Sequence, residues 1–328
     1  MRKGAKRDRN PVLGTERRVE RPLQVGLRSS DTVHFLHVPK TGGTSLYEVL
    51  ATQFPASQVL PRKARETLID ELRSSADHRP WRYRLTRMHH DYSVYRYFPR
   101  KPIFVTMLRN PADRVVSLYG HIQRVVGHPL HTYLLERQLD LEGFCRDPIF
   151  QEGIHNAQVR YLVGTREEGD LTRGATLEIA KIRLDEFAFF GMVERFAESI
   201  HLLFHTFGWS EVEYAALNVR PEGASPTIDP RTLEIVRSLT ELDHELYEYA
   251  CGLFEKRIAQ MIEEKWEEQK KGRLLLRSLR LMAIRDKDLK RLTDPSRIQL
   301  SRLRRVLVPE GSVLEPIYVG LRKRLLGW

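Results

Sequence analysis

Apolar residues along this chain gather in short runs that alternate with segments of helical periodicity. Three runs have the continuous apolar character of buried strands, at residues 32–38, 103–108 and 187–193. Apolar positions spaced for one helix face occupy 44–50, 112–125 and 231–268, and the segment 130–208 is mainly helical with breaks at Gly164, Gly169 and Gly174. This alternation predicts an α/β layered domain over residues 31–268, with a central, mainly parallel sheet flanked by helices.

Positive charge is concentrated at the two ends of the chain. The 328 residues carry a formal net charge of +11, of which residues 1–28 hold +6 and residues 273–328 hold +9, so the middle carries −4. We therefore expect a basic flexible arm (1–30), the α/β domain (31–268) and a basic helical tail (269–328). The ends are predicted either to contact a polyanion or a membrane surface, or to be solvated without a partner. Nucleic acid is not the expected partner, and the oligomeric state stays open.

Composition excludes several classes of protein. The content of 41% hydrophobic and 30% charged residues is typical of globular chains and not of disordered ones. The two cysteines, Cys145 and Cys251, are too few for a disulfide framework or a four-cysteine zinc site and suit a reducing compartment. No run approaches the roughly 18 apolar residues of a membrane span, and the first ten residues lack the apolar stretch of a signal peptide. We expect a cytoplasmic location, with any membrane contact peripheral.

The segment after the first strand has the composition of an anion-binding loop. Pro39-Lys40-Thr41-Gly42-Gly43-Thr44-Ser45 joins that strand to a helix. Its glycines allow backbone N–H groups to approach a ligand at the positive end of the helix, and its side chains add a charge and hydroxyls. A Walker A loop has its glycines before the lysine, where His34 and Pro39 stand here, so an ordinary ATPase or GTPase is disfavoured. The alternative is a plain turn between strand and helix.

The end of the second run carries a candidate phosphate ligand. Arg109 directly follows residues 103–108, and ligands of open α/β sheets bind at the carboxyl ends of strands. Asn110, followed by Pro111, is predicted to cap the next helix. Ser117 lies two helical turns further, on the same face as the cap. Arg109 and Ser117 are thereby predicted to converge on one phosphate, unless they are an ordinary surface arginine and helix serine.

These two segments together resemble sulfotransferases that use 3′-phosphoadenosine 5′-phosphosulfate (PAPS). Residues 39–45 and 108–119 carry the resemblance, which is closest to the carbohydrate group that includes heparan sulfate 2-O-sulfotransferase-like enzymes. It implies a P-loop-like fold, PAPS as sulfuryl donor and no metal. In that family the first loop binds the 5′-phosphosulfate, and the arginine and serine bind the 3′-phosphate. The residues that take these roles here are Lys40, Thr41, Gly42, Gly43, Thr44 and Ser45 for the loop, and Arg109 and Ser117 for the 3′-phosphate.

Further matches extend the resemblance over residues 32–262. Residues 156–162, 190–196 and 242–247 resemble the family's Asn-x-Gln-x-Arg-x-Leu segment, its Val-Gly-x-x-Glu strand end and its Asp-x-x-Leu-Tyr helix. The family's usual general base is a histidine after a glycine, to which His89-His90 corresponds with the glycine replaced. Position favours His90 as the base, with His89 as rival and a structural pair as the alternative. Lys40 is implied to neutralise the leaving phosphate, and His34 and His37 are predicted to be structural.

The implied acceptor is a carbohydrate hydroxyl, with small alcohols, lipids or protein tyrosine as alternatives. Residues 79–101 surround His89-His90 and hold seven Lys/Arg with Asp91 as the one acid, which favours an anionic saccharide over a solvent-facing stretch. The relevant side chains are Arg79, Arg82, Arg84, Arg87, Arg96, Trp81, Tyr83, Tyr92 and Tyr95, with Arg160 and Arg220 as further candidates. Two other functions stay open: a P-loop-type nucleotide kinase, and a non-catalytic polyanion-binding protein.

Overall fold

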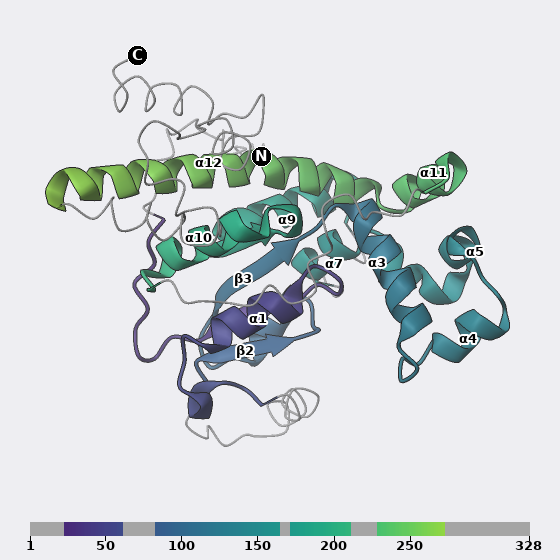
Figure 1. Cartoon of the computed structure of the whole chain (residues 1–328), viewed down its shortest axis with the longest axis horizontal. Coiled ribbons are helices and arrows are strands. Elements are labelled where there is room, and N and C mark those ends of the chain that lie inside the picture. Colours follow the sequence, from purple (N-terminus) through teal and green to yellow (C-terminus); the bar gives the residue numbers. More distant parts are fainter. Residues whose placement is uncertain (1–22, 62–82, 165–170, 211–227, 273–328) are drawn as a thin grey trace, which may run out of the picture.

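A four-stranded parallel sheet organises the computed structural model, which describes residues 23–61, 83–164, 171–210 and 228–272 (Figure 1). The strand order is β2-β1-β3-β4. The strands are β1 (Val33–Leu36), β2 (Leu85–Met88), β3 (Ile103–Leu108) and β4 (Phe189–Met192). Leu36 is in register with Met88 on one side and Thr106 on the other. Since all pairs are parallel, the carboxyl ends of the strands share one edge, and the predicted α/β class with a parallel sheet is confirmed.

Helices and short 3₁₀ turns connect and cover the strands, with α1 lying over one face of the sheet and α12 running along the molecule (Figure 1). The bounds in the first half are α1 (Gly43–Ala51), η1 (Ala56–Gln58), η3 (Tyr92–Tyr97), α3 (Pro111–Arg124), α4 (His131–Glu136), α5 (Leu141–Arg146), η4 (Pro148–Phe150) and α6 (Gln151–Ile154). Those in the second half are α7 (Ala157–Val163), α9 (Arg173–Glu186), η5 (Val193–Arg195), α10 (Phe196–Phe207), α11 (Pro230–Leu239) and α12 (Glu241–Gly272).

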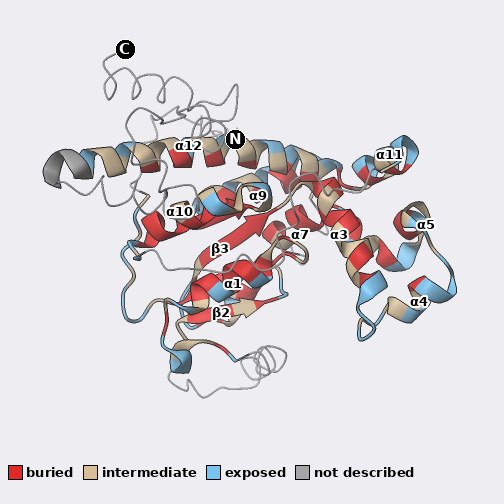
Figure 2. Cartoon of the chain, in the orientation of Figure 1, coloured by how far each residue is buried: buried red, intermediate tan, exposed pale blue. Residues whose placement is uncertain are grey.

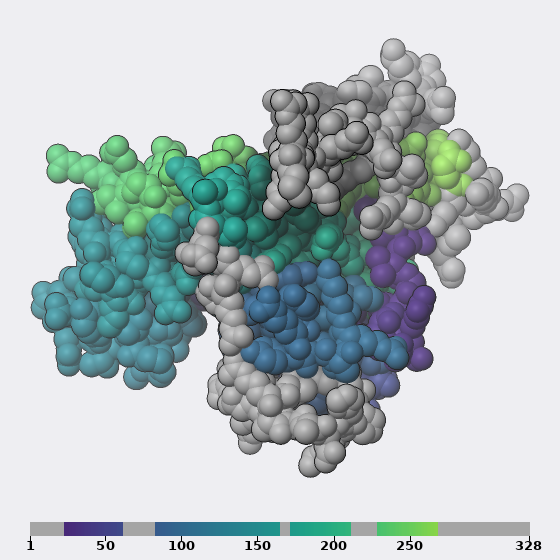
Figure 3. Space-filling view, turned by 180° about the vertical axis from the view of Figure 1, so that it is seen from behind, coloured from purple at the N-terminus to yellow at the C-terminus, as the bar shows by residue number. Residues whose placement is uncertain are grey.

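Two separate hydrophobic clusters hold these elements together. The larger one surrounds the sheet, whose strands and inner helix faces are buried in Figure 2. The smaller one lies inside a helical lobe made by α3, α4, α5 and α11, with Phe144 and Val236 at its centre, both 0% exposed. The lobe protrudes from the main body in the view from behind (Figure 3). Arg114, fully buried on α3, donates through Nη2 to the carbonyls of Gly153 and Ile154 and so ties α3 to α6.

The last residues before β1 pack on the domain. Leu23, Val25 and Leu27 are half-buried against the larger cluster. The N–H of Val25 donates to the Thr206 carbonyl at 2.6 Å. Residues 23–30 of the predicted arm therefore pack on the domain, while residues 1–22 of that arm and residues 273–328 of the predicted tail lie outside the described residues.

Three local expectations are corrected by the structure. The strand β2 lies within the basic stretch 79–101, where no strand was predicted, because its short Leu-Thr-Arg-Met sequence has no apolar run. The helical pattern over 231–268 belongs to two helices, α11 and α12, which are separated at Thr240. Gly174 lies in the first turn of α9 and does not break it. The predicted strand at 103–108 and the cap at Asn110 are confirmed, since the Asn110 side chain accepts from the N–H groups of Ala112 and Asp113.

Candidate active site

Sheet topology selects one position for a ligand. From β1 the chain moves to β2 on one side, and then returns to place β3 on the other side of β1. This reversal is a topological switch point, and open α/β sheets bind ligands in the crevice outside the carboxyl ends of the strands at such a point. The loop 37–42 leaves β1 there, and Arg109 leaves β3 beside it. The fold therefore brings the two predicted anion-binding segments to one edge.

The loop after β1 opens α1 with a backbone suited to an anion. Lys40 and Gly42 both have φ of 70°, in the left-handed region. Gly42 is the N-cap of α1, and the first turn of this nine-residue helix has no side-chain cap and no acidic residue. Its backbone N–H groups, together with the helix dipole, therefore favour a negative group at this end. The Thr41 hydroxyl donates to the Val38 carbonyl at 2.8 Å and so stabilises the loop from inside.

The packing beneath the loop requires a glycine at position 43. A Cβ on Gly43 would stand 1.9 Å from Nε2 of His37, a buried side chain whose ring stacks on Phe35. The His37 ring also lies 4.4 Å from the ring of His89, measured between centroids. His37 is thus a structural histidine, as predicted, and it links the loop to the residue that follows β2.

Arg109 is joined directly to the loop. Its Nη1 donates to the Lys40 carbonyl at 3.2 Å. The Gln158 side chain makes two hydrogen bonds to the Arg109 backbone. Its Oε1 accepts from the Arg109 N–H at 3.0 Å, and its Nε2 donates to the Arg109 carbonyl at 2.9 Å. The next N–H, of Asn110, donates to Glu194 Oε1 at 2.8 Å. Three side-chain contacts therefore fix the backbone from which the arginine projects.

A buried network supports Gln158 from α12. Asp243, fully buried, accepts from the N–H groups of Gln158 and Val159, and burial raises its pKa against the lowering effect of Arg114. Asn156, in the left-handed region with φ of 42°, accepts from the N–H groups of Leu242 and Asp243. The sequence analysis matches these segments to family motifs, but it predicts no role for Asn156, Gln158 or Asp243. The signal in the sequence is the presence of these polar side chains within the matched motifs.

Ser117 and two further histidines lie on the side of the site formed by α3. Ser117 is half-buried, and His121 follows it by one helical turn on the same face. Burial and the nearby Lys40 charge both lower the pKa of His121. Burial, His131 and Lys40 also lower the pKa of His128. The ring centroids of His128 and His121 lie 5.9 Å apart. Neither imidazole is predicted from the sequence as a site residue, because the contact between their rings forms only when the α3–α4 loop folds back on α3.

The two histidines after β2 are exposed but face different neighbours. His89 is in ring contact with His37, beneath the anion-binding loop. His90 acts electrostatically on His34. His34 is fully buried, hydrogen-bonded through Nδ1 to Thr86 Oγ1 at 2.8 Å, and burial lowers its pKa to about 3. His34 is therefore a neutral structural histidine, as predicted.

Among the described residues of the predicted aromatic and basic surface, Tyr92, Arg84 and Arg87 make structural contacts. Tyr92 is buried and packs its ring against Phe104, 4.8 Å between centroids. Arg84 donates to the carbonyls of Arg28 and Asp31. Arg87 stands over the Tyr47 ring at 4.4 Å and donates to the Gly43 carbonyl. Of the remaining candidates, Tyr83 and Tyr95 are half-buried, Arg96 is exposed, and Arg160 donates to the Glu152 carbonyl, while Arg79, Trp81, Arg82 and Arg220 lie outside the described residues.

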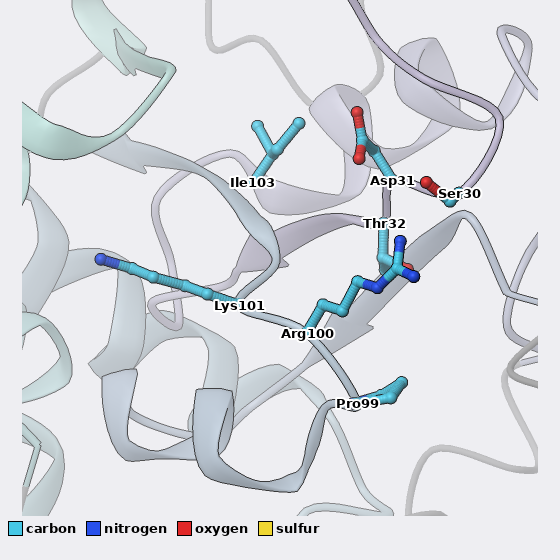
Figure 4. Close-up of a pocket in the computed structure, with 7 residues that line it drawn as sticks. All are labelled: Ser30, Asp31, Thr32, Pro99, Arg100, Lys101 and Ile103. Carbon is cyan, nitrogen blue, oxygen red and sulfur yellow. The ribbon is translucent and has the colours of Figure 1, made fainter. Parts of the chain in front are cut away.

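Two pockets lie near the strands, one away from the switch point and one that reaches the loop after β1. One is at the amino ends of β1 and β3, lined by residues that include Asp31, Arg100 and Lys101 (Figure 4). The Arg100 side chain extends toward Thr32 in that view, whereas Lys101 points away and pairs with Glu186. The other groove runs along α1, includes Tyr47 and Arg87, and reaches the loop at Thr44. Within the part of the chain that the structure describes, there is no group of three metal-ligating side chains and no helix able to span a membrane.

Comparison with known proteins identifies the class of enzyme. Residues 29–313 match the galactose-3-O-sulfotransferase family, which is most of the chain. The chain belongs to that family. It is 26% identical over 289 residues to human heparan-sulfate 6-O-sulfotransferase 1, covering 74% of this chain and 70% of that protein. It is 28% identical to Danio rerio heparan-sulfate 6-O-sulfotransferase 2, over 74% of this chain and 62% of that protein. It is 26% identical to Bos taurus galactose-3-O-sulfotransferase 3, over 70% of this chain and 58% of that protein.

This family membership decides between the functions left open by the sequence. The protein is a sulfotransferase, so the expected enzyme class is confirmed, and the nucleotide kinase and the non-catalytic polyanion-binding protein are set aside. The resemblance to carbohydrate sulfotransferases is likewise confirmed. The 2-O-specific relationship is not, because the relatives named above are 6-O- and 3-O-sulfotransferases.

Proposed function

We propose that this sulfotransferase transfers the sulfuryl group of PAPS to a hydroxyl of a carbohydrate. The observation that carries the proposal is the hydrogen bond from Arg109 to the Lys40 carbonyl, which joins the two anion-binding segments at the switch point. We assign the 5′-phosphosulfate to Lys40, Thr41, Gly42, Gly43, Thr44 and Ser45, and the 3′-phosphate to Arg109 and Ser117.

The residues at this edge suit a donor with two separated anionic groups. The uncapped start of α1 offers backbone N–H groups to one group. The Arg109 guanidinium, on a backbone fixed by Gln158, offers a planar fork of donors to the other. Thr41 contributes as part of the loop backbone, since its hydroxyl is directed to Val38.

We assign the general base to His89 in preference to His90. Its ring contact with His37, which packs against Gly43, supports a position beside the loop that holds the sulfuryl group. His89 accepts the proton of the acceptor hydroxyl as that oxygen bonds to sulfur. The bond from sulfur to the bridging phosphate oxygen breaks, and Lys40 neutralises the charge on the departing 3′,5′-adenosine bisphosphate. Positioning and electrostatic stabilisation supply most of the rate, and a base contributes about 10²–10⁴-fold.

A glycan acceptor is supported by the names of the relatives, which act on heparan sulfate or galactose. We propose an anionic glycan. Comparing a heparan-type oligosaccharide with a neutral galactose-terminated one as acceptor for [³⁵S]PAPS tests this choice. Faster transfer to the neutral sugar would contradict it without affecting the sulfotransferase assignment.

Thermal unfolding with and without 3′,5′-adenosine bisphosphate tests the donor site. Ligand at 100 times its Kd stabilises the folded state by about 2.7 kcal/mol, which raises Tm by a few degrees. We expect this shift in the wild type and in Arg146→Ala, which removes an exposed arginine on the lobe. We expect its loss in Arg109→Ala and Lys40→Ala. Equal shifts in all four proteins, or a shift with ATP and Mg²⁺ in place of the bisphosphate, would contradict the proposal.

A further inference from the structure

Two imidazoles on the lobe side of the proposed donor site have no role in the scheme above. His121 lies on α3, one turn beyond Ser117, and His128 lies in the loop between α3 and α4. Their rings meet edge to face with centroids 5.9 Å apart. Both side chains are half-buried, and the Lys40 charge contributes to lowering the pKa of each. His121 shares the face of α3 that carries Ser117, and His128 contacts its ring, so the pair lies on the α3 side of the proposed donor site.

Hydrogen bonds fix the proton on one of the two rings. Nδ1 of His128 accepts from the Leu130 N–H at 3.1 Å, so the ring proton of neutral His128 is on Nε2. If His128 were protonated at Nδ1, that N–H would point at the Leu130 N–H, and the hydrogen bond between them would be lost. His128 is therefore suited to donate one neutral hydrogen bond. His131, its neighbour, is occupied at Nδ1 by the Ile122 carbonyl, 2.8 Å away, and does not share this freedom.

His121 is the ring whose charge a ligand would change. The groups acting on it are Lys40 from the loop, His128 from the α3–α4 connection and Arg124 from its own helix, and each disfavours a positive charge. Without a ligand, His121 is accordingly neutral near pH 7. An anionic phosphate or sulfate beside Lys40 reverses that balance, because an opposite charge within a few ångströms favours the imidazolium.

We propose that His121 and His128 are two further donor-binding residues: His128 donates a neutral Nε2–H to the anionic donor, and His121 takes up a proton when the donor binds. The inference rests on the proposed function, because it requires PAPS or its product at the Lys40 loop. It also makes donor affinity rise as pH falls from 8.5 to 6.5, through a group other than the catalytic base.

Isothermal titration calorimetry tests the proton uptake. 3′,5′-Adenosine bisphosphate is titrated into the full chain at pH 7.0 in two buffers of different ionisation enthalpy, PIPES and Tris, which gives the number of protons taken up. We expect the wild type to take up at least about 0.3 proton more than His121→Asn. The control His244→Asn removes a half-buried histidine of lowered pKa on α12 and is expected to match the wild type.

Affinities measured in the same titrations test each histidine separately. At pH 6.5, Kd for the bisphosphate should rise roughly 5-fold in His121→Asn and in His121→Gln, and the difference should vanish at pH 8.5. His128→Ala should weaken binding about 5-fold at both pH values, and His128→Asn, which retains an N–H donor, should recover most of it. The melting temperature of each variant without ligand monitors folding.

The outcomes separate this inference from the function on which it rests. Proton uptake and Kd within twofold of the wild type in both His121 variants would overturn the inference while leaving the donor site intact. A wild-type protein that does not bind the bisphosphate would overturn the proposed function, and the inference with it.

Discussion

Gln158 is predicted to control both the stability of the domain and the position of Arg109. This side chain is 1% exposed, and its two hydrogen bonds to the Arg109 backbone measure 3.0 and 2.9 Å. Gln158→Leu keeps a similar volume but removes both partners. Each unsatisfied backbone group costs about 1–3 kcal/mol when buried, and the half-buried Arg109 retains some access to water, so we expect a loss of about 2 kcal/mol.

Urea unfolding and bisphosphate binding measure the two effects. The unfolding midpoint should fall with the slope m unchanged. Kd for 3′,5′-adenosine bisphosphate should rise about 10-fold or more, because Arg109 loses its fixed backbone. Gln123→Leu, which changes an exposed glutamine on α3, is the matched control and should alter neither quantity.

Gln158→Glu provides a second, pH-dependent measure of the same contact. A protonated glutamic acid reproduces both hydrogen bonds, one as acceptor and one as donor. Burial raises the folded-state pKa of such a carboxyl above its unfolded value, so the stability it supports is present at low pH and lost as pH rises through the folded pKa. Relative to the wild type, this variant should therefore be more stable at pH 5.5 than at pH 8. If both variants matched the wild type in stability and affinity, the role assigned to Gln158 would be refuted.

Three further predictions concern the loop, a cap and a buried histidine. Gly43→Ala forces the His37 ring aside and should lower the free energy of unfolding in urea by about 1–3 kcal/mol. In the His37→Ala background this loss should largely disappear. Equal losses in both backgrounds would contradict the contact. Asn110→Ala should lose about 1 kcal/mol of stability because two capping hydrogen bonds are removed, whereas Asn110→Asp should retain it. His34 is neutral when folded, with a pKa of about 3, so unfolding binds a proton below pH 6.5 and stability is lost as pH falls. Between pH 7.5 and 5.5 the wild type should lose about 1.4 kcal/mol more than His34→Gln, and parallel pH profiles would rule this out.

The local sequence was sufficient to predict the helices and strands that bury their own apolar residues. The run at 103–108 forms β3 with the same bounds, and Asn110-Pro111 caps α3, because capping depends on a few neighbouring residues. The loop chemistry of residues 39–45 was equally visible, since positive φ and helix N-termini are properties of short segments. These local signals were sufficient for the α/β class and for locating the two candidate anion-binding segments at strand ends.

Tertiary structure decided what local pattern does not encode. The strand β2 exists through its pairing with β1, where Thr86 meets His34, and its own sequence has no strand signal. The ring contact that supports His89 as the proposed base joins it to His37, which is distant in sequence, and the hydrogen bonds from Gln158 to Arg109 join residues 49 positions apart. Contacts of this kind depend on the path of the whole chain, because a buried polar group must find its partner wherever the fold places one.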